Sequence, residues 1–416
     1  MTPTILFIVA ILAGLYMAWN IGANDVANAI GTSVGSGALT VRRAIILAGI
    51  FEFAGAFLVG SAVSQTIRKG IVPVEAFGGR PDVLAIGMLS ALVGAAVWLN
   101  VATFFAQPVS TTHAIVGAVI GFAMVAVGPG CIRWSKTGMI AATWVVSPLV
   151  GGLLAYLVYR AIQRFVLQNR HPVFMARRAV PVCFGAVICL LTLSIVYRGL
   201  HGLHLDLPIW AALPTALAAG VLGGIGARYL IHRRSQDSRV RMGQRYQVVE
   251  GWFARIQVVT ACYMAFAHGA NDVANAIGPL AGTLHLIGGG KMAAQTQVPV
   301  WLLALGGIGI VIGLATYGYK VMEAIGKKIT EITPTRGFAA EFGTATTVLV
   351  CSKLGMPIST TLVLVGAVMG VGIARGFGAI DLRVVRRIFT SWVITIPASA
   401  FFAAVIFYIL RACVLP

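Results

Sequence analysis

Apolar residues run through this chain in stretches close to the width of a bilayer, separated by shorter polar segments. Examples are Val83–Phe105, Gly138–Tyr159 and Ile388–Leu410. A helix needs about 20 predominantly apolar residues to cross the hydrocarbon core. The pattern therefore predicts an all-α integral membrane protein with about twelve transmembrane helices.

The composition supports a membrane location. Of the 416 residues, 58% are hydrophobic and 10% are charged, whereas a soluble protein carries about 25% charged residues. We therefore expect apolar side chains to face lipid. The expected location is the plasma membrane, typically a bacterial inner membrane, crossed several times.

The net charge of +19 reflects topology rather than binding of nucleic acid. Basic residues gather in two stretches, residues 160–178 and 228–245, which flank two apolar spans. Loops rich in Lys and Arg remain in the cytoplasm, so we assign both stretches to that side. Continuing the crossings outward from them predicts that both termini lie outside.

Two motifs occur twice. Tyr16–Gly31 and Tyr263–Gly278 are identical at thirteen of sixteen positions, and both contain the string GANDVANAIG. Pro108–Gly121 and Pro357–Gly370 are identical at nine of fourteen positions. The offsets, 247 and 249 residues, are almost equal, which indicates an internal duplication.

The duplication divides the chain into three parts. Residues 1–160 form the first repeat, residues 161–250 a linking insert of two helices with a basic cytoplasmic loop, and residues 251–416 the second repeat. About five crossings in each repeat would invert one repeat relative to the other. Secondary transporters are often built this way, with broken or re-entrant helices near the membrane midplane.

Each copy of the longer motif carries an acid in an apolar span. A carboxylate there costs roughly 2.5–3.5 kcal/mol on insertion scales, which indicates a functional role. Helical spacing places carboxylate and amide groups on one face, and the flanking glycines allow either a local break or close helix packing. The residues concerned are Asn24, Asp25, Asn28, Asn271, Asp272 and Asn275.

The shorter motifs are predicted helix starts. Proline interrupts the preceding helix, and Ser or Thr can cap the next one. Backbone N–H groups at a helix start favour an anion, and hydroxyls add further donors: Ser110, Thr111, Thr112, Ser359, Thr360 and Thr361. Donors facing aspartate acceptors suit an anion that itself carries protons, such as hydrogen phosphate.

Two further acids, Glu52 and Glu341, lie in apolar spans but not at matching repeat positions. Each could bind a cation, relay a proton or pair with a basic group, and we favour a coupling role. The cation-coupling set, at which Na⁺ could bind, is then Asp25, Asn28, Glu52, Asp272, Asn275 and Glu341. Polar packing is at least as good an interpretation of His113 and His268 as proton transfer, so we expect their replacement to have the mildest effects.

Other chemistry is not indicated. The six cysteines lack the spacing of a metal or redox site. The sequence contains no phosphate-binding P-loop and no dinucleotide fingerprint. We therefore expect no cofactor and no enzymatic activity.

On its two GANDVANAIG strings and its Pro-Val-Ser-Thr-Thr and Pro-Ile-Ser-Thr-Thr segments, the chain resembles the inorganic phosphate transporter (PiT) family. The resemblance covers both repeats. It implies a twelve-helix inverted-repeat fold, symport of phosphate with sodium or protons, and a homodimer. It also implies functional roles for Asp25, Asp272, Glu52 and Glu341.

Two alternatives remain open. A sulfate permease could use the same scaffold, but sulfate carries no proton at neutral pH, and two aspartates would repel it unless a proton or cation neutralised them. An intramembrane aspartyl protease also needs two aspartates within the membrane. It would not need duplicated Ser-Thr-Thr helix starts.

Overall fold

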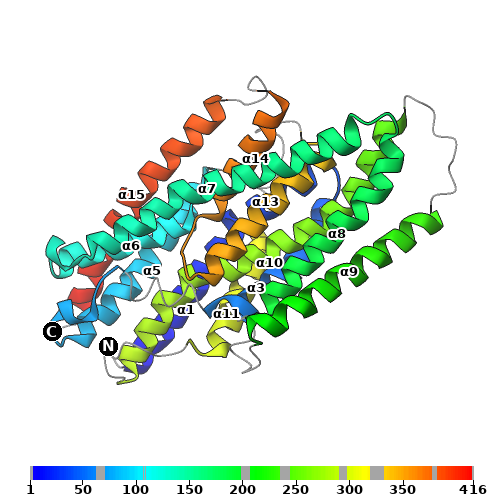
Figure 1. Cartoon of the computed structure of the whole chain (residues 1–416). Coiled ribbons are helices and arrows are strands. Elements are labelled where there is room, and N and C mark those ends of the chain that lie inside the picture. The colour runs from blue at the N-terminus through cyan, green and yellow to red at the C-terminus, as the bar shows by residue number, and fades with distance from the viewer. Residues whose placement is uncertain are drawn as a thin grey trace.

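The computed structural model describes residues 3–61, 71–105, 107, 109–197, 207–234, 244–289, 298–318, 332–376 and 382–414, and over these residues it contains helices and no strands. Residues up to 167 form α1 (Pro3–Asn24), α2 (Val26–Gly35), α3 (Val41–Val59), α5 (Pro81–Phe104), α6 (Thr111–Ala126), α7 (Trp134–Ile162) and the short helices η1 (Val74–Phe77), η2 (Pro129–Cys131) and η3 (Gln163–Leu167). The predicted all-α architecture is confirmed (Figure 1).

The rest of the chain begins with a helical hairpin, α8 (Pro172–Val196) and α9 (Ile209–Arg234). The hairpin lies within residues 161–250, whose role as a linking insert stays a prediction. The chain continues with α10 (Arg245–Ile287), α11 (Val300–Gly313), η6 (Leu314–Gly318), α13 (Pro334–Lys353), α14 (Thr360–Arg375) and α15 (Leu382–Val414). Helix α10 has 43 residues, and it packs against α1, α3, α5 and α13. It therefore runs through the centre of the helix assembly (Figure 1).

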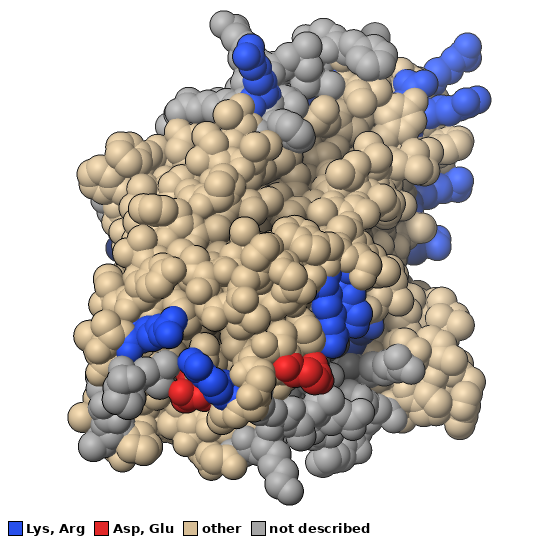
Figure 2. Space-filling view, turned by 90° about the vertical axis from the view of Figure 1, so that its left-hand side faces the viewer, with Lys and Arg blue, Asp and Glu red and all other residues tan. Residues whose placement is uncertain are grey.

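Seven helical segments of the described chain are long and apolar enough to cross a membrane: Pro3–Gly35, Pro81–Phe104, Trp134–Leu167, Pro172–Val196, Ile209–Arg233, Val300–Gly318 and Thr390–Val414. Their outer faces carry large exposed apolar side chains; Met139 and Leu149 of α7, for example, are each 68% exposed. Figure 2 shows a broad area without Lys, Arg, Asp or Glu in the centre of one face, with Lys and Arg side chains along its right-hand edge. Such an apolar surface can face the hydrocarbon core of a bilayer. The total of about twelve crossings stays a prediction.

Helices that carry related sequences make matching contacts. Helix α6 packs against α15, and α14, which carries the second copy of the α6 motif, packs against α7. The helices that carry the longer motif behave similarly: α1 packs against α11, and α10 packs against α3. The two copies of each motif thus lie in similar helical surroundings.

The glycines of the longer motif serve close packing. A Cβ atom at Gly22 would overlap the backbone carbonyl of Ile310, and one at Gly269 would overlap that of Glu52. The helix around the first motif is interrupted, since α1 ends at Asn24 and α2 begins at Val26. The possible break at the second motif is absent, because α10 continues from Arg245 to Ile287.

Candidate functional site

All four repeated segments meet in one buried cluster, which we call the central site: Asn24, Asp25, Ser110, Thr111, Thr112, Asn271, Asp272, Asn275, Ser359, Thr360 and Thr361. Each of these side chains is at most 2% exposed. Their contacts run between segments far apart in the sequence, since Thr111 and Asp25 are separated by 86 residues. The side chain of Asn28 lies outside the described part of the structure.

The first asparagine of each motif, Asn24 or Asn271, makes three equivalent contacts in its own repeat. Asn271 Nδ2 donates to the carbonyl of Ile358 (2.9 Å) and to Asp272 Oδ1 (3.2 Å), and Asn271 Oδ1 accepts from the Ser352 hydroxyl (3.3 Å). With the Asn24 amide turned so that its oxygen faces a donor, Asn24 donates to the carbonyl of Val109 (3.1 Å) and to Asp25 Oδ1 (3.2 Å), and accepts from the Thr103 hydroxyl (2.7 Å). Each asparagine therefore holds its aspartate against the start of a helix.

The two aspartates accept hydrogen bonds from the predicted hydroxyl donors. Thr111 Oγ1 donates to Asp25 Oδ2 at 2.7 Å, and Thr360 Oγ1 donates to Asp272 Oδ2 at 2.9 Å. In each repeat, the aspartate of the longer motif thus pairs with the first threonine of the shorter one. The structure brings together the donors and acceptors that the sequence predicts.

Other contacts join the two repeats. Thr361 Oγ1, from the second repeat, lies 3.4 Å from Asp25 Oδ1 and donates to it. Asn275 Nδ2 donates to the hydroxyls of Thr111 and Thr112 at 3.1 and 3.2 Å. The halves therefore build one polar cluster rather than two separate ones.

The shorter motifs are helix starts, as predicted. Ser110 caps α6 by accepting from the backbone N–H of His113 (3.2 Å), and Ser359 caps α14 by accepting from that of Leu362 (3.3 Å). Such starts present N–H groups and the positive end of the helix dipole. Both point into a buried region that already holds the two aspartates.

A buried histidine, His268, connects Glu52 with this cluster, and we include both residues in the central site. His268 Nδ1 lies 2.8 Å from the Glu52 carboxylate, and Nε2 lies 2.9 Å from Asp272 Oδ2. All three side chains are fully or almost fully buried. When both ring nitrogens carry protons, the imidazolium forms an ion pair with each acid and offsets part of their charge.

The central site also has the atoms for a small cation. One ligand atom each from Asp25, His268 and Asp272 lies within 4.8 Å of the other two. Carboxylate and hydroxyl oxygens are suitable ligands for hard cations. The same groups can alternatively hold a proton.

Glu341 lies in a second cluster, the Glu341 cage, and not beside the aspartates. Its Oε1 accepts from the hydroxyls of Thr32 and Ser33, both at 2.6 Å, and from Gln257 Nε2 at 3.1 Å. Its Oε2 accepts from the Thr260 hydroxyl at 2.6 Å. Helices α2, α10 and α13 thus surround a fully buried carboxylate with neutral donors.

The structure separates the two histidines that the sequence treats alike. The His113 ring packs against Trp144 at an interplanar angle of 47° with ring centroids 3.9 Å apart, and neither of its ring nitrogens has a hydrogen-bond partner among the described residues. His268 instead touches two acids, so the mild effect expected of its replacement is revised. The position of His268 directly before the second GANDVANAIG string was the signal, but its partner Glu52 lies 216 residues away.

Comparison with known proteins decides the family. The sequence profile of the phosphate transporter family matches residues 21–403. The chain belongs to this family. It is 46% identical over 420 residues to inorganic phosphate transporter 2-1, chloroplastic, of Arabidopsis thaliana, over 95% of this chain and 70% of that protein.

A solved structure agrees with this assignment. The structure described as the sodium-dependent phosphate transporter superposes with a TM-score of 0.91 at 40% sequence identity, covering 98% of this chain and 99% of that one. The resemblance seen in the two repeated motifs is therefore confirmed. This member of the phosphate transporter family is a multi-pass membrane protein whose relatives are transporters rather than enzymes.

Proposed function

We propose that this protein is a secondary active symporter that imports inorganic phosphate together with Na⁺ or H⁺, and that phosphate binds at the central site. The observation that carries the proposal is the paired arrangement at the two helix starts. Each start offers backbone N–H groups and a threonine hydroxyl, and each faces an aspartate. Donors and acceptors thus stand together in one buried place.

This arrangement matches the chemistry of hydrogen phosphate. Its unprotonated oxygens would accept from Thr111, Thr360 and the N–H groups at the helix starts, which favour anions. Its hydroxyl would donate to Asp25 or Asp272, because an ionised carboxylate only accepts. In the structure the threonines donate to the aspartates, so binding exchanges these hydrogen bonds for bonds to the substrate.

The acids of the central site explain why a cation should accompany the anion. Two like charges about 4 Å apart repel each other by about 4 kcal/mol at an effective dielectric constant of about 20. Phosphate beside Asp25, Asp272 and Glu52 would be repelled by several carboxylates. One imidazolium at His268 offsets only part of this repulsion. A sodium ion or proton bound with the phosphate lowers this cost.

The Glu341 cage is a candidate for coupling-ion binding. Thr32, Ser33 and Thr260 place hydroxyl oxygens against the carboxylate, and Gln257 adds an amide. Rotation of the hydroxyls would turn these donors into oxygen ligands for Na⁺. The solved neighbour is described as sodium-dependent, which favours Na⁺ over H⁺ here.

Alternating access would arise from two inverted repeats, residues 1–160 and 251–416, moving around the central site. The matching contacts of α6 with α15 and of α14 with α7 support this proposal. We infer further that both termini lie outside the cell and that the transporter is a homodimer. Cysteines introduced near Arg170 and near each terminus of a cysteine-free variant should label from opposite sides, and light scattering should give twice the chain mass.

Uptake into proteoliposomes tests the substrate. A sodium gradient and a proton gradient are imposed in separate experiments, and purified protein should accumulate labelled phosphate under at least one of them. Arsenate should compete well with phosphate and sulfate poorly. Sulfate uptake that phosphate does not inhibit would rule out the proposal. The gradient that drives uptake identifies the coupling ion.

A further inference from the structure

A groove of about 980 Å³ lies between α8 and α9, in the insert and outside the central site. Both helices are long and apolar enough to cross a membrane. Helix α9 packs against α8, and the two form a hairpin at one side of the helix assembly (Figure 1). The open side of this groove therefore lies along the bilayer.

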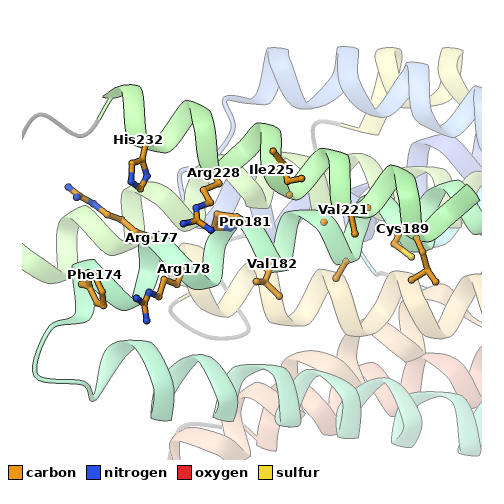
Figure 3. Close-up of a pocket in the computed structure, with 15 residues that line it drawn as sticks. Phe174, Arg177, Arg178, Pro181, Val182, Cys189, Val221, Ile225, Arg228 and His232 are labelled. Carbon is orange, nitrogen blue, oxygen red and sulfur yellow. The ribbon is translucent and has the colours of Figure 1, made fainter. Parts of the chain in front are cut away.

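One end of the groove is basic. Arg177 and Arg178 of α8 and Arg228 and His232 of α9 line it together, as Figure 3 shows. The Arg178 guanidinium lies 4.4 Å from the Phe174 ring centroid, and that of Arg177 lies 5.6 Å from the Trp252 ring centroid. None of the fifteen lining residues is acidic, so the wall at this end carries a net positive charge.

One polar atom at this end has no hydrogen-bond partner. The Nε of Arg177 is buried and makes no hydrogen bond in the described structure. A buried donor left without an acceptor is destabilising. Arg177, which lines the basic end of the groove, thus has hydrogen-bonding capacity that the described residues do not use.

The rest of the groove is apolar. Val182 is 71% exposed, and Val221 and Ile225 are each 60% exposed, and all three line its wall away from the basic end (Figure 3). The floor is formed where Gly185 and Gly220 let the helices approach, since a Cβ atom at Gly220 would lie 2.7 Å from the Cβ of Cys189. The groove thus has a floor of small residues and walls of large aliphatic side chains.

We propose that this groove binds an anionic phospholipid. The headgroup phosphate accepts from Arg177, Arg178 and Arg228 at the membrane surface, where basic pockets between helices suit such headgroups. The acyl chains follow Val182, Val221 and Ile225 toward the middle of the bilayer. A soluble anion would use only the basic end and would leave the apolar wall uncovered.

Lipid retention by the full-length protein tests this proposal. The protein is purified in detergent with equal amounts of dioleoyl phosphatidylglycerol and dioleoyl phosphatidylcholine, and bound lipid is measured by native mass spectrometry. We expect phosphatidylglycerol to be retained preferentially and not to be displaced by millimolar glycerol 3-phosphate. Equal retention of the two lipids, or displacement by the soluble phosphate, would overturn the proposal.

Two variants with matched controls locate the site. The triple variant Arg177→Gln, Arg178→Gln, Arg228→Gln should lose affinity for phosphatidylglycerol by about fivefold per arginine, the order expected for a basic side chain at an anionic surface. The control Arg160→Gln, Arg164→Gln, Arg170→Gln removes the same charge from exposed positions outside the groove and should bind normally. Equal loss in both would mean that general surface charge attracts the lipid.

The second variant, Val221→Trp, fills the apolar part of the groove and should reduce retention without changing charge. Its control is Leu222→Trp, one residue along α9, 69% exposed and not part of the lining. Unchanged retention by Val221→Trp contradicts the proposal. So does a change of oligomeric state by Val221→Trp alone, because it would show that a second copy of the chain covers the groove.

Discussion

The two clusters of buried acids differ in what surrounds their carboxylates. In the central site, Glu52 and Asp272 face the ring nitrogens of His268, a partner that can carry charge. In the Glu341 cage, the carboxylate accepts, among the described residues, only from three hydroxyls and an amide. A charged partner offsets the negative charge of the acids beside a bound anion. Neutral donors leave the negative charge of the carboxylate in place, so that it can attract a cation.

This difference stands on a frame that is similar in both repeats. Gly269 crosses the backbone of Glu52, and Gly22 crosses the backbone of Ile310 in the matching helix pair. Glu341, by the offset of the shorter motif, corresponds to Leu92. Each acid thus has an apolar counterpart in the other repeat, Ile310 for Glu52 and Leu92 for Glu341. We therefore propose that the duplicated residues bind a substrate shared by both halves, and that the unpaired acids give the halves different tasks.

The largest effect is expected from the aspartates. Asp25→Asn and Asp272→Asn keep the size of the side chain but replace an acceptor by a group that also donates. We expect phosphate uptake to fall by roughly tenfold to a hundredfold, since a hydrogen bond to a charged group contributes about 1.5–3 kcal/mol. If the motif only joined helices, uptake would change little, because hydrogen bonds within the membrane average about 0.6 kcal/mol. Uptake by proteoliposomes with equal amounts of folded protein distinguishes the two.

The next effect concerns the histidine of the central site. His268→Gln leaves two buried acids without a cationic partner, and breaking a buried ion pair costs about 3–5 kcal/mol. We expect a lower unfolding temperature and weak uptake, with stability partly recovered in the double variant Glu52→Gln, His268→Gln. His113→Gln is the control and should transport well. Additive stability losses in the double variant would show that Glu52 and His268 do not interact.

A smaller and different effect is expected in the Glu341 cage. Glu341→Gln keeps the shape and removes the charge that would attract a cation. We expect the sodium concentration for half-maximal uptake to rise by roughly tenfold, the size of a change of about 1.4 kcal/mol, while the half-saturating phosphate concentration changes little. The matched change in the central site is Glu52→Gln. Glu52 belongs to the cation-coupling set predicted from the sequence, but its contact through His268 with Asp272 leads us to expect a main effect on phosphate. The same response to both changes would remove the distinction between the two clusters.

The smallest effects are expected at the helix caps and hydroxyls. Ser110→Ala and Ser359→Ala each lose a cap worth about 1 kcal/mol, and Thr111→Val and Thr360→Val each lose one hydrogen bond to an aspartate. Uptake should fall by a few fold, because the N–H groups at the helix starts remain. An abolished uptake in a stable Thr111→Val variant would show that the hydroxyl itself is indispensable.

Much of the central site could be predicted because duplication marks its residues. Asp25 and Thr111 each recur in the second half as Asp272 and Thr360, and polar residues in apolar spans are costly. The helix starts followed from local rules for proline and hydroxyl residues. The all-α membrane architecture followed from the length of the apolar runs.

The Glu341 cage could not be predicted in the same way. Thr260 and Gln257 lie on α10 in a stretch that repeats nothing, and Thr32 and Ser33 follow the first motif without counterparts in the second. They meet only because α2, α10 and α13 pack together. The same holds for the contact of His268 with Glu52. Such sites depend on tertiary contacts between helices, which spacing along one sequence does not show.

Equilibrium binding of phosphate to the single aspartate variants tests the central claim, that both repeats build one phosphate site. Purified Asp25→Asn and Asp272→Asn are titrated with phosphate in sodium buffer by calorimetry, beside the unchanged protein. The shared hydrogen bonds of Asp25 with Thr111 and Thr361 predict that either substitution alone weakens phosphate binding by roughly tenfold to a hundredfold. Binding of unchanged affinity by either folded variant would contradict a single shared site.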